Sequence, residues 1–185
     1  MYEWVALVGD ALIAAVIFYE IEEHRASTFL SDVQGAEFYK KRAQLYDKYA
    51  HVSGATPKER AEAFRNLLWE DPELRELCDS QYTDFCRLRY MLRYSPMHRS
   101  LLAKWFPQVM VSFWAITAVY QRERNRLRPT PIANYYLIAV RESLKELKKY
   151  GLSPVTIYSR DSLIRVEITG GDLEKMLTDL DAPFK

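Results

Sequence analysis

The first twenty residues carry the strongest hydrophobic pattern of the chain. Residues 4–19 read WVALVGDALIAAVIFY, with Asp10 as the only charged side chain. A helix of this length extends about 24 Å, slightly less than the hydrocarbon core of a bilayer, which is about 30 Å thick. Because apolar residues occur around the whole helix, no face is marked for water. The pattern predicts an N-terminal transmembrane helix, and the alternative is a helix buried by protein.

The charges around this segment predict its orientation. No lysine or arginine precedes it, and the first basic residues come after it: Arg25, Lys40, Lys41 and Arg42. Basic residues that flank a membrane span are enriched on the cytoplasmic side. We therefore expect residues 1–24 to be a membrane anchor and residues 25–151 to form a cytoplasmic body.

Helix start signals organise this body. Thr56, Pro57 and Glu59 combine a capping box with proline at the first helical position, which predicts a helix over residues 57–70. Asp71 repeats the start signal and predicts a third helix that ends near residue 95.

An apolar run near the middle of the chain predicts the centre of a helical bundle. Residues 109–120 read VMVSFWAITAVY, which is too short to span a bilayer and suits a helix buried by protein. Helical spacing resumes over residues 132–150, and Gly151 fits the position that closes a helix. Short loops between the helices favour an antiparallel bundle.

The C-terminal segment, residues 152–185, changes from helical to alternating spacing. Apolar and β-branched residues at 155–157 and 163–168 flank a polar turn, which predicts a β-hairpin. Residues 172–180 then predict a short amphipathic helix. The expected fold class is therefore all-α: a transmembrane helix, an antiparallel helical bundle and a small hairpin-and-helix appendage.

The composition limits the chemistry. A net charge of +1 gives no overall reason to expect nucleic acid. Cys78 and Cys86 are eight residues apart on one expected helix, too distant to bridge, so they are expected to be buried thiols in a reducing compartment. His24, His51 and His98 are widely separated. Without ligand spacing or a glycine-rich phosphate loop, the sequence predicts no metal, no cofactor and no identifiable small-molecule substrate.

Asp10 is a candidate site because a carboxylate inside a membrane span needs shielding from lipid. Ala11 and Ala15 form a small-xxx-small pair that lets a neighbouring helix approach closely. Several copies packed around one axis would place Asp10 at their shared centre, which predicts a homo-oligomer. The alternative is that Asp10 caps or reaches solvent within a soluble fold.

A basic patch is predicted where the central helix ends. The sequence RERNRLR contains four arginines: Arg122, Arg124, Arg126 and Arg128. Cations near a helix C-terminus are favoured by the helix dipole, so a solvated helix end is one interpretation. Binding of RNA, acidic lipid or a partner protein is the other.

The segment RYSPMH at 93–98 places a histidine after an arginine and four intervening residues. It resembles the R-x4-6-H motif of HEPN ribonucleases, all-α proteins in which two chains pool Arg and His to cleave RNA without metal. The resemblance implies His98 as general acid or base and Arg93 as the group that stabilises the charged phosphorane. Tyr94 stands where the family usually has a small polar residue, and Pro96 interrupts the expected helix. An exposed turn is the alternative interpretation.

Two stretches, GDALIAAVIFYEIEEHR at 9–25 and FWAITAVYQRER at 113–124, resemble a bacterial family of unknown function. Its members are small helical proteins with one N-terminal membrane anchor, which implies the bacterial inner membrane with the body facing the cytoplasm. An anchor with a HEPN-like motif also resembles the accessory membrane protein of some RNA-targeting CRISPR systems. That protein assembles as a ring or pore and supports antiviral defence.

Three functions are therefore open from the sequence. The first is a membrane-anchored, self-assembling protein, as a pore or accessory component of antiviral defence and not as an enzyme. The second is a HEPN-like, metal-independent ribonuclease. The third is a soluble scaffold or interaction subunit whose first helix is buried by a partner.

Overall fold

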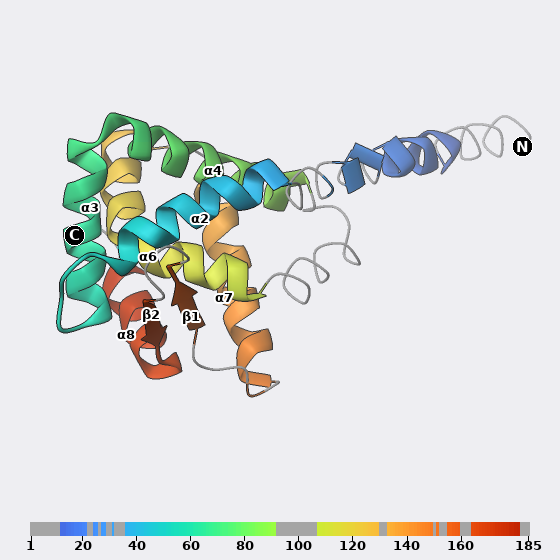
Figure 1. The fold of residues 1–185 in the computed structure, drawn as a ribbon. Coiled ribbons are helices and arrows are strands. Elements are labelled where there is room, and N and C mark those ends of the chain that lie inside the picture. The colour runs from blue at the N-terminus through green and yellow to red at the C-terminus, as the bar shows by residue number, and fades with distance from the viewer. Residues whose placement is uncertain are drawn as a thin grey trace, which may run out of the picture.

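The computed structural model describes residues 12–21, 24–25, 27–28, 31, 36–91, 107–129, 133–149, 151, 155–159 and 164–181. Residues 12–21 are helical, and Figure 1 shows them projecting away from the body of the molecule. The body is formed by the following elements: α2 (Ala36–Ala50), α3 (Pro57–Glu70), α4 (Pro72–Met91), α6 (Pro107–Leu127), α7 (Ala133–Lys149), β1 (Val155–Tyr158), β2 (Arg165–Ile168) and α8 (Gly170–Asp181).

The capping residues place the start and end of α3 and the start of α4 as the sequence predicts, whereas the predicted end of that helix near residue 95 lies outside the described residues. The Thr56 hydroxyl accepts from the Glu59 amide at 3.2 Å, and the Glu59 carboxylate accepts from the Thr56 amide at 3.3 Å. Asp71 ends α3 by donating its amide to the Leu67 carbonyl, and its carboxylate accepts from the amide of Leu74 at 3.0 Å to start α4. One residue thus serves both helices, which meet at a corner in Figure 1.

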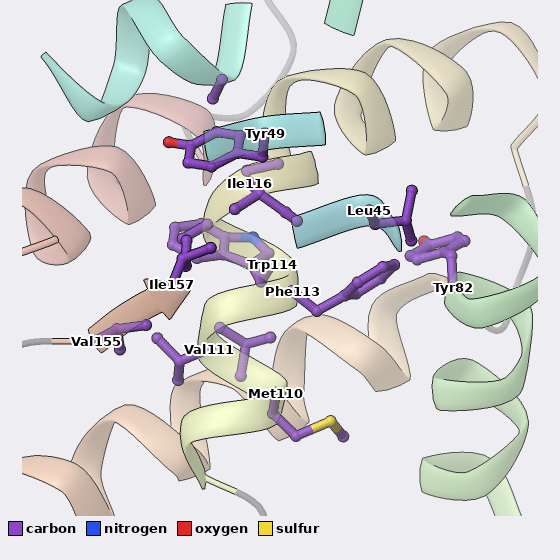
Figure 2. Packing of buried hydrophobic residues seen from close by; sticks show 14 of the residues in the cluster. Leu45, Tyr49, Tyr82, Met110, Val111, Phe113, Trp114, Ile116, Val155 and Ile157 are labelled. Atoms are coloured by element: carbon purple, nitrogen blue, oxygen red, sulfur yellow. The ribbon is translucent and has the colours of Figure 1, made fainter. Parts of the chain in front are cut away.

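α6 forms the centre of the core. Every residue from 110 to 118 is buried, as the apolar run predicts, and α3 and α7 pack along the helix. An aromatic cluster joins α6 to its neighbours: the Phe85 ring centroid lies 5.2 Å from that of Phe113 and 5.4 Å from that of Tyr136. Figure 2 shows Leu45 of α2 and Ile157 of β1 reaching the same helix from different sides.

The predicted hairpin and C-terminal helix are both present. β1 and β2 are antiparallel, with Val155 opposite Ile168 and Ile157 opposite Val166. These side chains are buried against the helices, and Leu173 and Met176 of α8 belong to the same core cluster. Alternation along the strands therefore adds one apolar face of the hairpin to the helical core.

The predicted transmembrane helix is wrong. Of the predicted span, the structure describes residues 12–19, and these are helical. Across the described residues, no helix is both long and apolar enough to cross a membrane. The sequence argument failed because apolar residues around a helix favour burial by protein as much as burial by lipid. The pore hypothesis depended on this span and loses its support with it. The fold does not test the predicted inner-membrane location.

Candidate functional site

The first two arginines of the predicted basic patch contact other helices of the same chain. Arg122 Nη1 donates to the backbone carbonyl of Asp179 in α8 at 3.2 Å. Arg124 Nε lies 2.8 Å from Asp79 Oδ1 in α4. Residues two apart on a helix are rotated by about 200° from each other, so neighbouring members of this series face different elements. That periodicity is the sequence signal that would have separated the four arginines.

Arg124 sits in a polar network that connects α4 with α6. Its guanidinium lies 5.1 Å from the centre of the Tyr82 ring, and the Tyr82 hydroxyl accepts from the Asn125 amide group at 2.8 Å. The Tyr120 hydroxyl donates to Asp79 at 2.9 Å. Burial raises the pKa of Tyr82 and of Tyr120 well above the ordinary value for a phenol. Both phenols therefore stay protonated near neutral pH and act as hydrogen-bonding groups, not as bases.

The last two arginines flank the most exposed apolar side chain of the body. Arg126 and Arg128 are exposed, and neither forms an ion pair with another described residue. Leu127 between them is 65% exposed. It follows Glu123 by four residues, so the two side chains share one face of α6.

Glu123 links this face of α6 to α3. Its Oε2 atom accepts from Trp69 Nε1 at 3.3 Å and pairs with Arg65 Nη1 at 3.3 Å. Trp69 is 36% exposed, and the Arg75 guanidinium lies 5.7 Å from its ring centre. Sequence analysis missed Trp69 because its partners, Glu123 and Arg75, lie on other helices, so no spacing within α3 marks it.

The Glu123 carboxylate contacts Arg65 and Trp69 of α3 and lies one helical turn before Leu127, so it marks a region where α3 meets the last turn of α6. We call it the α6-end surface and define it by five residues: Arg65, Trp69, Arg126, Leu127 and Arg128. Tryptophan and arginine are the residue types that most often dominate binding at protein interfaces. The chemistry of this surface therefore favours recognition of a partner over catalysis.

The second candidate site is the projecting helix of residues 12–21. Ala15 is exposed on this helix, among large apolar side chains that are also exposed. Asp10 and Ala11 lie outside the described residues, so their role at a shared axis stays a prediction. Arg93 and His98 also lie outside the described residues, and the HEPN-like ribonuclease stays a prediction for the same reason.

Other chemically active side chains in the described residues have structural contacts. His51 Nδ1 lies 2.8 Å from the backbone carbonyl of Asp47, while the Ser159 hydroxyl bonds the Asp47 carboxylate. Burial raises the pKa of the Cys86 thiol to about 11 and that of Cys78 well above its usual range. In the part of the chain described here, no three His, Cys, Asp or Glu side chains are grouped to hold a metal ion.

No known protein family, curated protein or solved structure matches this chain. The predicted memberships, in the bacterial family with one anchor and in CRISPR-type defence, therefore stay predictions. The function has to be argued from the two candidate surfaces.

Proposed function

We propose that this protein is an interaction subunit that self-assembles through the helix of residues 12–21. The observation that supports the proposal is the exposure of its large apolar side chains, which ranges from 41% to 62%. They are Leu12, Ile13, Val16, Ile17, Phe18, Tyr19 and Ile21. An apolar surface of this density is typical of a helix that is covered by protein when it functions.

The distribution of these side chains favours copies of the same chain as the covering partner. At about 100° per residue, Leu12 and Val16 lie on one side, Ile13 and Ile17 on a second, and Phe18 on a third. A partner that covers a single face would leave the others in water. Assembly of several copies supplies neighbours on more than one side, and Ala15 allows close approach.

Comparing the free energy gained by burial with the free energy cost of association also indicates that the helix must be covered on more than one side. Completing the burial of these side chains would contribute about 7 kcal/mol. Association costs about 4–15 kcal/mol in lost translational and rotational freedom. Because the two magnitudes overlap, a contact on one face of the helix would be marginal, and coverage on several sides or an additional contact is needed for a stable assembly.

The test is the oligomeric state of the full-length chain, measured by analytical ultracentrifugation over a range of concentrations. The double variant Ile13→Gln, Ile17→Gln replaces two exposed residues on one side of the helix. We expect the concentration for half-assembly to rise by at least about tenfold. The matched control is Ile138→Gln, Ile164→Gln, which makes the same change at two exposed positions of the body and should assemble like wild type.

Two results would refute self-assembly through this helix. One is a wild-type chain that stays monomeric at every concentration tested. The other is a helix variant that assembles as well as wild type while retaining the wild-type helical content by circular dichroism. If only the control variant loses assembly, the contact lies on the body and not on residues 12–21.

A further inference from the structure

The α6-end surface and the helix of residues 12–21 are complementary in chemistry. The surface joins two exposed apolar side chains, Trp69 and Leu127, to cations that make no ion pair with described residues, Arg126 and Arg128. The helix is apolar, and its exposed charged residue is Glu20. Residues 1–23 as a whole contain five acidic residues and no lysine or arginine: Glu3, Asp10, Glu20, Glu22 and Glu23.

The two surfaces lie at opposite ends of the molecule. In Figure 1 the helix of residues 12–21 extends beyond the start of α2, whereas α3 lies at the far side of the body. Contacts of Glu123 with Arg65 and Trp69 place the end of α6 against α3. The helix of one chain therefore lies far from the α6-end surface of the same chain in this structure, so a contact between the two would join different copies.

We propose that the helix of residues 12–21 docks on the α6-end surface of a second copy, so that the chains assemble head to tail. This inference rests on the proposed function and names the receiving surface for the assembly helix. Apolar contacts to Trp69 and Leu127 cover one side of the helix, and pairing of Arg126 and Arg128 with its exposed Glu20 supplies the additional contact that a one-sided interface needs. The interface is heterologous, so every open assembly has a free helix at one end and a free surface at the other, and it closes into a ring or grows as a filament.

The proposal predicts complementation between two defective variants. The helix variant is Ile13→Gln, Ile17→Gln. The surface variant is Leu127→Gln, Arg126→Glu, Arg128→Glu, which changes exposed side chains at the end of α6 and leaves the buried part of the helix intact. Each variant alone should need at least about tenfold more protein for half-assembly. An equimolar mixture should form dimers of one chain of each kind, because one intact helix then meets one intact surface.

The measurement uses the two full-length variants labelled with different fluorophores. Energy transfer reports mixed pairs, and sedimentation velocity reports whether assembly stops at two chains. The control mixture pairs the helix variant with the Ile138→Gln, Ile164→Gln chain, and it should grow beyond dimers because that chain retains both surfaces. Circular dichroism melts of every variant identify any that fail to fold, and Leu127→Gln alone is then used as a milder surface variant.

The outcomes separate this inference from the proposed function. If the surface variant assembles like wild type while the helix variant does not, the helix packs on other helices and the docking proposal is overturned, although self-assembly through residues 12–21 stands. If both variants lose assembly but their mixture forms no mixed dimers, the head-to-tail pairing is overturned. If the helix variant assembles like wild type, both proposals fail.

Discussion

Arg124 and Asp79 connect the end of the central helix to α4, with Nε of the arginine 2.8 Å from Oδ1 of the aspartate. Their side chains are 20% and 35% exposed, so the pair is only partly shielded from water. The same carboxylate accepts a hydrogen bond from Tyr120, one helical turn before Arg124. This contact fixes the direction in which α6 presents its last turn, where Leu127 lies.

Asp79→Ala should destabilise the fold. The change leaves the Tyr120 hydroxyl without its acceptor and Arg124 without its counter-ion, and we expect a loss of about 1–3 kcal/mol in the free energy of unfolding. Urea denaturation measures this. The control is Lys58→Ala, which removes the exposed pair between Lys58 and Asp179 and should cost less than about 1 kcal/mol. Equal losses for the two variants would contradict a structural role for the Asp79 network.

Thr56→Ala should weaken the start of α3. The Thr56 hydroxyl caps the Glu59 amide, and loss of such a cap typically costs about 1 kcal/mol. Chemical denaturation of Thr56→Ala and of Ser53→Ala, an exposed serine outside the helices, gives the comparison. The serine variant should differ from wild type by less than about 0.5 kcal/mol. A Thr56→Ala protein as stable as the Ser53→Ala protein would show that the capping box contributes nothing.

The stability contribution of Asp84 should depend on pH. Burial raises the pKa of this carboxyl above its ordinary value of 3.8, against the opposing charges of Arg87 and Lys41. A raised pKa means that the folded chain holds the proton more tightly than the unfolded chain does. The resulting stabilisation is complete below the ordinary pKa and is lost as the pH rises through the raised value.

Asp84→Asn should therefore be more stable than wild type at neutral pH, because the amide carries no charge to desolvate. The advantage should shrink on acidification and disappear below about pH 4. Urea midpoints measured across this range test the sign, with Glu62→Gln at an exposed position of α3 as the control. A wild-type protein that is the more stable of the two at neutral pH would contradict the prediction.

The two cysteines should react with thiol reagents only after unfolding. With its pKa raised to about 11, the Cys86 thiol is ionised in about one chain in a thousand at pH 8, compared with about a quarter for a free cysteine. Cys78 is also buried, so access is blocked for both. Dithionitrobenzoate should detect both thiols rapidly in denaturant and neither rapidly in native buffer. Rapid modification of the native protein would show that this part of α4 opens.

Local signals were sufficient to determine several helix boundaries within the part of the chain that the structure describes. Thr56 and Asp71 act on amides within the next few residues, so their effect is visible in the sequence itself. Gly151 is similar: it lies two residues after the end of α7, and its φ of 65° is accessible to glycine at little cost. The apolar residues of α6 likewise predicted their own burial, because a helix that is apolar on every side has no face suited to water.

The surroundings of a side chain were decided only by the tertiary structure. The spacing of Arg122, Arg124 and Arg126 shows that they share a helix, but Arg122 contacts α8, Arg124 contacts α4 and Arg126 is exposed. Trp69 and Leu127 lie on separate helices, so no periodicity in the chain connects them. Hydropathy also marked the helix of residues 12–21 as a surface to be covered, but it could not choose between lipid and protein, because both exclude water from apolar side chains. Sequence determines which groups need a partner, and the packing of distant segments decides which partner each group finds.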